Sequence, residues 1–328
     1  MTPLLWLVML SSVLLVAALV GPRLIERSAP VLASVPRLAA AALTVGALVW
    51  ITGLVFLGPL VAWIGVGPEW LPAKATELCQ RCLAASSPFG KSSITYAIPA
   101  FIPLSVPFLG AVLIVAGAVR EVRRTLAASR EVREAVAASG RPERIYGHRV
   151  WVSDAPQPEA FALPAKRGGI VVSRGTLGLL TDEELASVLA HEQAHLDQRH
   201  HAWLAALLGA THYFRWIPCI ASIRSSVASL LEIAADQAAG RATAPTGVAA
   251  ALLKLGQLEA NLTHARLLPA PPAVMNAVGS ERVRSLVGVA HPKGSRALLA
   301  TLLACGCMLA LAVGVVHWPY VLALLTGC

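Results

Sequence analysis

Charged residues are scarce in this chain. They make up 14% of its 328 residues, whereas hydrophobic residues make up 56%, well above their share in ordinary soluble domains. Each stretch without charge is about as long as the ~20 residues that a helix needs to cross the hydrocarbon core of a bilayer. The sequence therefore predicts an α-helical multipass membrane protein, rather than a large soluble protein with buried helices. About four transmembrane helices are expected, at residues 4–20, 39–64, 92–119 and 297–316.

No positive charge precedes the first hydrophobic stretch, which argues against a signal peptide. Arginines follow that stretch instead, at Arg23, Arg27 and Arg37, and place the next loop in the cytosol. The third helix then returns to the cytosol at residues 120–149, where eight arginines stand against four glutamates. Arginines beside a bilayer need no further partner, so we expect lipid contact and no direct nucleic-acid binding. The predicted division is 1–119 for three transmembrane helices, 120–149 for a basic amphipathic stem, 150–296 for a cytosolic catalytic domain, and 297–328 for the fourth helix and a short tail.

Two other absences narrow the possible functions. No ionisable residue lies within the four hydrophobic stretches, which argues against a transporter. Only six cysteines are present, and no second pair lies near Cys79 and Cys82 to complete another metal site with them. Cys79 and Cys82 fall in the loop between the second and third helices, which this topology places outside the cytosol. Whether they form a disulfide stays open.

The segment from His191 to His195 has the HEXXH pattern of zinc peptidases. Two histidines four apart lie on one face of a helix, so both imidazoles can reach one ion. Glu192 lies on the same turn and can act as general base on a water molecule bound to that ion. The pattern predicts a zinc metalloendopeptidase, and the alternative is an ordinary surface helix with two histidines.

A second acidic cluster strengthens this interpretation. Glu232 offers a third zinc ligand on a second helix, and a set of two histidines and one glutamate leaves a coordination position open for water. Asp236 lies one turn further on the same face. We expect it to accept the other ring proton of a ligand histidine, although a surface salt bridge is the alternative. The predicted cofactor is one zinc ion per chain.

Short β-like runs precede the HEXXH segment, at residues 149–152, 159–163 and 170–173. They predict a small antiparallel sheet, and therefore an α+β domain of the zincin type. Thr181 and Glu184 have the spacing of a capping box at the start of the metal-binding helix. Residues Ala160, Phe161 and Ala162 are the candidate edge strand for an extended substrate.

Several polar residues near the motif have less certain roles. His200 and His201 follow His195 by five and six positions, which on a continuous helix directs them away from the metal. His212 and Arg215 are weak candidates for stabilising the oxyanion of the transition state. Residues 202–214 are too short to cross a bilayer and form either a buried core helix or a segment at the membrane interface.

The segments EAFALP, GGIVVSRGTL, TDEELASVLAHEQAHLDQRHH and EIAADQAAG together resemble the BlaR/MecR-type antirepressor metallopeptidases. More distantly, they are similar to the HtpX and CAAX prenyl protease family. The resemblance implies zinc ligation by His191, His195 and Glu232, with Glu192 as base and Asp236 as the supporting aspartate. It also implies a bacterial plasma membrane location, a substrate strand beside AFALP, and a cytosolic winged-helix repressor as a partner.

The chain departs from these families in two ways. Beta-lactam receptors carry a large sensor domain after their last helix, whereas this chain is expected to lack one. HtpX-like proteins have two membrane helices between the HEXXH motif and the glutamate, and the gap here is shorter. The favoured function is regulatory proteolysis of a repressor or another protein substrate. The alternatives are quality control of membrane proteins, or a signalling scaffold with a structural or silent metal site.

Overall fold

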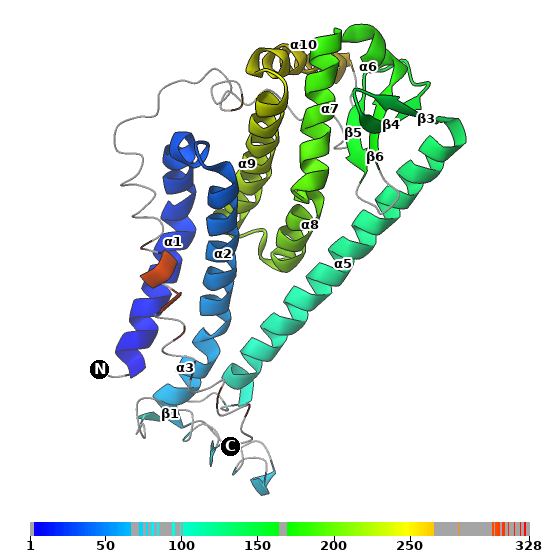
Figure 1. Ribbon diagram of the computed structural model, residues 1–328. Coiled ribbons are helices and arrows are strands. Elements are labelled where there is room, and N and C mark those ends of the chain that lie inside the picture. Colours follow the sequence, from blue (N-terminus) through cyan, green and yellow to red (C-terminus); the bar gives the residue numbers. More distant parts are fainter. Residues whose placement is uncertain are drawn as a thin grey trace.

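The computed structural model describes residues 3–66, 101–163 and 169–265, together with Arg282 and isolated positions between 67 and 100 and beyond 303. Helices dominate these residues. Helices α1 (Pro3–Leu32) and α2 (Pro36–Val55) lie side by side, and α3 (Leu57–Ile64) follows α2 (Figure 1). Helix α5 (Phe101–Ser139) slants away from the end of α3 and leads to a small sheet at its far end. A short parallel pair joins β1 (Gly65–Val66) to β2 (Ile94–Thr95).

Four helical segments of the described residues are long and apolar enough to cross a membrane: Leu4–Leu32, Pro36–Ile64, Phe101–Val136 and Pro218–Ala242. The first three overlap the helices expected from the sequence. The expected fourth helix, at 297–316, lies almost entirely outside the described residues, as do Cys79 and Cys82. The fourth segment found here is instead the helix that carries Glu232. One helix is thus apolar enough to cross a membrane and also carries a candidate metal ligand.

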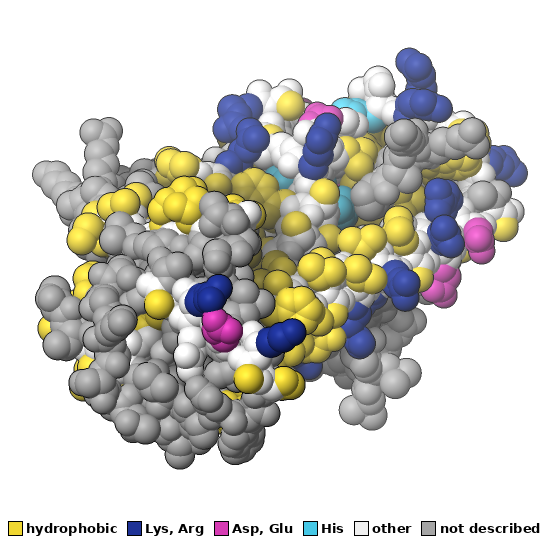
Figure 2. Space-filling view, turned by 90° about the horizontal axis from the view of Figure 1, so that it is seen from below, with side chains coloured by type: hydrophobic (Ala, Val, Ile, Leu, Met, Phe, Trp, Pro, Cys, Tyr) yellow, Lys and Arg dark blue, Asp and Glu magenta, His cyan; other side chains and the backbone are white. Residues whose placement is uncertain are grey.

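Hydrophobic side chains cover much of the surface of the long helices. Large apolar residues on α1 and α5 are more than half exposed, among them Leu15, Val16, Phe108 and Val115. Viewed from below, yellow side chains form a continuous stretch of the surface, and blue side chains of Lys and Arg lie mostly at its edges (Figure 2). Such a contiguous apolar surface is expected where lipid replaces water.

The sheet has four strands in the order β3-β4-β6-β5, formed by β3 (Arg141–Ile145), β4 (His148–Ser153), β5 (Ala160–Leu163) and β6 (Gly169–Ser173). The sequence predicted the last three strands but an entirely antiparallel sheet, and this second expectation is wrong. Strands β4 and β6 are parallel. The reason is topological: the chain leaves β4 for the outer position of β5, and then returns as β6 between them.

The sequence did not predict strand β3, because residues 120–149 were all assigned to the amphipathic stem. Helix α5 ends at Ser139, and β3 begins two residues later. A two-residue turn at Tyr146 and Gly147 joins β3 to β4, and both residues have positive φ angles, of 47° and 83°. This is the backbone conformation that a tight hairpin requires.

Helix α7 (Asp182–Asp197) packs on this sheet. Its stripe of Leu185, Val188 and Leu189 is buried in one hydrophobic cluster with strand residues such as Ile170 and Val172. The predicted capping box is present, since Thr181 and Glu184 each bond the other's backbone N–H. Helices α6 (Arg174–Leu179) and α10 (Pro245–Ala265) also contribute residues to this cluster. The sheet therefore fixes the position of the helix that carries the HEXXH motif.

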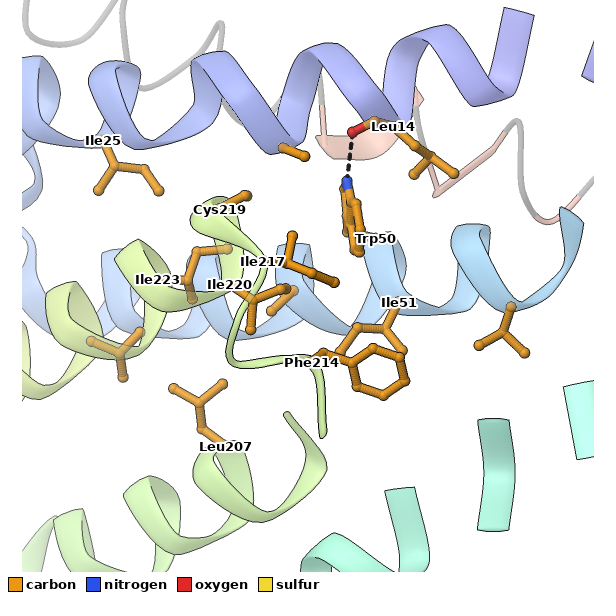
Figure 3. Close-up of a cluster of buried hydrophobic side chains, with 14 of the residues drawn as sticks. Leu14, Ile25, Trp50, Ile51, Leu207, Phe214, Ile217, Cys219, Ile220 and Ile223 are labelled. Atoms are coloured by element: carbon orange, nitrogen blue, oxygen red, sulfur yellow. Dashed lines mark hydrogen bonds between the residues drawn. The ribbon is translucent and has the colours of Figure 1, made fainter. Parts of the chain in front are cut away.

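A helical hairpin connects α7 to the membrane-facing helices. It consists of α8 (His200–Ala210), the short helix η1 (His212–Phe214) and α9 (Pro218–Ala242). Phe214 and Ile217 lie near the tip of this hairpin and pack in one cluster with Leu14 and Trp50 of α1 and α2 (Figure 3). The Trp50 indole N–H donates to the Leu14 carbonyl across 3.0 Å.

The structure decides between the two interpretations of residues 202–214. Helix α8 packs against α5 so closely that a Cβ on Gly117 would lie 2.3 Å from the Gly209 carbonyl oxygen. The Trp203 indole N–H donates to Thr44 of α2 at 3.1 Å. Trp216 at the tip, in contrast, is 77% exposed. Residues 202–214 thus form a packed segment that ends at the buried Phe214, and the exposed Trp216 follows it.

Candidate metal centre

Two helices bring the three expected ligands together. His191 and His195 lie one turn apart on α7, and Glu232 faces them from α9. The Nε2 atoms of the two histidines are 3.0 Å apart. The Glu232 oxygens lie 3.6 Å from His191 Nε2 and 3.5 Å from His195 Nε2. Ligand atoms of the three residues all lie within 4.8 Å of one another, so they could hold one metal ion.

The other ring nitrogen of His191 faces a buried ion pair. His191 Nδ1 lies 3.0 Å from Asp236 Oδ1, and neither side chain is more than 1% exposed. Asp236 in turn accepts two hydrogen bonds from Arg282, at 2.7 and 2.8 Å. The carboxylate is fully buried, which excludes a surface salt bridge. Its contact with His191 is close in distance but lacks the geometry of a hydrogen bond, so the expected role of Asp236 as acceptor of the ring proton stays a prediction.

Sequence reasoning missed Arg282. Its side chain is 3% exposed, and its Nη1 atom also lies 3.4 Å from Glu232 Oε2. One guanidinium group thus contacts two carboxylates of the centre and offsets part of their negative charge. The sequence offered only an indirect signal: an aspartate buried beside two histidines and a glutamate needs a cation, but many arginines could supply it.

His200 is not among the candidate metal ligands, as expected, but the expectation that it is solvated or interfacial is wrong. The His200 side chain is 3% exposed, and its Nδ1 atom lies 2.9 Å from His195 Nδ1. The reason is a break between the two helices, because Arg199 adopts a left-handed conformation with φ 53° and ψ 39°. The break turns the first residue of α8 back towards α7. His201 is also nearer than expected, with its ring centre 6.0 Å from that of His195.

The two ligand histidines differ in their affinity for protons. Burial lowers the pKa of His191, but its contacts with Asp236 and Glu232 outweigh this effect and raise it to about 10. Burial and the neighbouring His191 lower the pKa of His195 to about 3. Two Nε2 atoms 3.0 Å apart cannot both present lone pairs to each other, so in the metal-free centre one of them carries a proton and donates it to the other. The raised pKa of His191 favours the proton on that ring, and the donor set suits a zinc ion in its place.

Glu192 is buried beside the two histidines, with 5% exposure. Burial raises its pKa to about 7, against the opposing effect of His191. The backbone N–H of Ala162 in β5 donates a hydrogen bond to the Glu192 carboxylate. A carboxylate whose pKa lies near neutrality and whose orientation is set by the backbone has the properties of a general base.

Strand β5 lies at an edge of the four-stranded sheet. The Ser173 N–H donates to the Glu159 carbonyl, so the backbone groups of Glu159 and, by alternation, Phe161 face β6. Those of Ala160 and Ala162 point to the other side, where Ala162 meets Glu192. Of the three residues expected to bind substrate, Ala160 and Ala162 therefore direct backbone groups away from the sheet, whereas the backbone of Phe161 is paired.

His212 and Arg215 do not lie at the centre. They follow α8, whose eleven residues separate them from His200 by about 15 Å at 1.5 Å per residue. Arg215 Nη1 donates to the His212 carbonyl at 2.9 Å, so the two residues form a local pair at the hairpin tip. The expectation that they stabilise an oxyanion is wrong, because the hairpin carries them away from the metal.

Two histidines and a glutamate beside a buried glutamate base form the kind of centre found in zinc metallopeptidases. Residues 123–259 match the model of peptidase family M48. This segment includes α7, α8, α9 and the sheet, and thus all three candidate ligands. The match indicates a membrane-associated metallopeptidase domain with zinc as its metal. No solved structure matches the chain.

Proposed function

We propose that the protein is a membrane-bound zinc metalloendopeptidase, whose active site lies in the cytosol and cleaves a regulatory protein. The observation that carries this proposal is the joint placement of His191, His195 and Glu232 beside the buried base Glu192. A structural zinc site would need a fourth protein ligand, and the described residues offer only three.

Zinc bound by these three side chains would polarise the scissile carbonyl and lower the pKa of a water molecule. Glu192 then accepts the proton of that water and delivers it to the leaving amine. The Ala162 N–H holds the Glu192 carboxylate in position through its hydrogen bond. Arg282 offsets part of the negative charge of Asp236 and Glu232, and it favours the ionised form of Glu192.

The substrate class follows from β5 and from the helices around the centre. An extended peptide can pair with the outward backbone groups of Ala160 and with the Ala162 carbonyl, which would lie beside Glu192. Glu232 keeps 29% of its side chain exposed, which leaves one side of the centre accessible. A cytosolic winged-helix repressor is the partner that the BlaR/MecR resemblance favours, in a bacterial plasma membrane.

The test compares newly formed protein N-termini in cells that express the wild type or the Glu192→Ala variant. Glu183→Ala is a matched control, because Glu183 lies on the same helix but is exposed. New termini in a cytosolic repressor, present with the wild type and the control only, would support the proposal and identify the substrate.

Other outcomes favour other functions. Termini spread over many membrane proteins would indicate quality control instead. If the wild type binds zinc and yields no new termini under several stresses, the proposal fails in favour of a signalling scaffold with a silent metal site. Zinc content measured in both variants separates loss of the base from loss of the metal, because Glu192→Ala should keep zinc.

A further inference from the structure

His200 is a buried histidine that the proposed reaction does not use. Its Nδ1 atom lies 2.9 Å from His195 Nδ1, on the side of the ring opposite the candidate metal. Its Nε2 atom lies 3.2 Å from the side-chain oxygen of Gln198. His200 therefore connects a candidate ligand to an amide group at the end of α7.

The direction of these hydrogen bonds follows from the chemistry of the groups. An amide oxygen only accepts, so the Nε2 atom of His200 must carry a proton. A neutral imidazole has one N–H, which leaves a lone pair on His200 Nδ1. His195 Nδ1 then donates to it, and the lone pair of His195 is left on Nε2, which faces His191 and Glu232.

We propose that His200 is a positioning residue for the metal centre, which fixes the tautomer and the ring orientation of His195. The proposal deepens the proposed function and rests on it only for the identity of the ligands. A ligand histidine commonly donates its second ring proton to a carboxylate or a carbonyl. Here an imidazole from the next helix performs this role.

The break at Arg199 makes the contact possible. On a continuous helix, a residue five positions after His195 would lie about 140° around the axis, out of reach of its ring. Because Arg199 is left-handed, α8 starts in a new direction with His200 as its first residue. The rings of His195 and His200 meet edge to face, with centres 4.9 Å apart. Fixing the ring of His195 in this way lowers the cost of ordering it when metal binds.

The experiment measures the zinc affinity of the full-length protein in detergent by competition with a chelator, and the visible spectrum of its cobalt form. Three variants are compared with the wild type. His200→Leu removes the acceptor, and His200→Asn keeps an acceptor near the position of Nδ1. His201→Leu is the matched control, because it removes the adjacent histidine, which has no hydrogen bond to His195 among the described residues.

We expect His200→Leu to lower the zinc affinity about 10- to 100-fold and to alter the cobalt spectrum. His200→Asn should restore most of the affinity, and His201→Leu should change neither quantity. The proposal is overturned if His200→Leu binds zinc as the wild type does, or if His200→Asn and His200→Leu lose affinity equally. It is also overturned if His201→Leu causes the same loss.

These results are distinct from failure of the proposed function. If the wild type itself binds neither zinc nor cobalt, the metallopeptidase proposal fails, and this inference falls with it. If the wild type binds metal but cleaves nothing, the role of His200 is still decided by the affinities and spectra. A monodisperse elution profile for each variant shows that it is folded, so that a loss of affinity is not a loss of structure.

Discussion

The second ring nitrogens of the two candidate ligand histidines face groups of different charge. His191 faces the carboxylate of Asp236 at 3.0 Å, with Arg282 behind it, whereas His195 faces the neutral imidazole of His200 at 2.9 Å, with Gln198 behind it. The distances are almost equal, but only the contact between His195 and His200 has the geometry of a hydrogen bond. The contacts of His191 with Asp236 and Glu232 raise its pKa to about 10, whereas burial and the neighbouring His191 lower the pKa of His195 to about 3.

This difference separates two tasks that a supporting residue can perform. A carboxylate makes its histidine more basic, and therefore a stronger zinc ligand, but it also holds a competing proton. A neutral partner orients the ring without adding such competition. The charged support joins segments far apart in the sequence, from α7, α9 and Arg282, whereas the neutral support is made within a few residues of His195.

We expect the largest loss of zinc affinity on replacing Glu232, which faces both candidate ligand histidines. Replacing Glu232 with Ala removes the carboxylate that faces both Nε2 atoms, so the zinc affinity should fall by more than the ~10- to 100-fold typical of supporting residues. Metal content after dialysis checks this prediction. Glu192→Ala is the control that should keep its zinc, and an unchanged metal content in Glu232→Ala would remove Glu232 from the ligand set.

Loss of the ion pair between Asp236 and Arg282 should strongly lower the folding stability. Asp236→Leu leaves Arg282 buried without its bidentate partner, and such a loss typically costs about 3–5 kcal/mol of folding stability. Thermal unfolding of the metal-free protein measures it. The double variant Asp236→Leu with Arg282→Met should regain stability but not zinc affinity. If Asp236→Leu is no less stable than His200→Leu, the contrast between charged and neutral support is wrong.

The proton on His191 should make zinc binding depend on pH. Since the pKa of His191 is raised to about 10, zinc must displace one proton at lower pH. The apparent affinity should therefore rise up to tenfold per pH unit between about pH 7.5 and pH 9.5, and level off above. Chelator competition at several pH values measures the slope. Asp236→Asn removes the charge that raises this pKa, so its slope should be shallower, and an equal slope would place the proton elsewhere.

We expect the smallest change in zinc affinity on replacing Gln198, whose side-chain oxygen faces His200. Gln198→Glu supplies an oxygen that can only accept, so the zinc affinity should be kept or rise slightly. Gln198→Met removes the acceptor and should lower the affinity by less than His200→Leu does, because the direct contact with His195 remains. Should Gln198→Glu bind zinc more weakly than Gln198→Met, the hydrogen bonds must run in the opposite direction.

Much of the candidate centre could be predicted because its features are local. Spacing along one helix places His191, Glu192 and His195, and the capping box at Thr181 marks where that helix begins. Alternating apolar residues revealed three of the four strands of the sheet. Three of the helices apolar enough to span a membrane were evident from the length of their uncharged stretches. Each of these patterns reflects a geometry that repeats within a few residues.

Features that depend on the path of the chain could not be predicted in this way. The parallel pairing of β4 and β6 depends on where β5 is placed, and the position of α9 beside α1 and α2 depends on packing across more than 150 residues. Periodicity along one element carries no information about which face of another element it will meet.

The sequence by itself thus determined which residues are the candidate ligands and the candidate base, because these follow from helical spacing and from the chemistry of the side chains. Only the tertiary structure decided which side chains contact the second ring nitrogen of each candidate ligand histidine. A single left-handed residue, Arg199, turns His200 towards His195, and a buried Asp236 selects Arg282 as its partner. Both outcomes depend on backbone direction and burial, since a polar group removed from water must find a partner wherever the fold provides one.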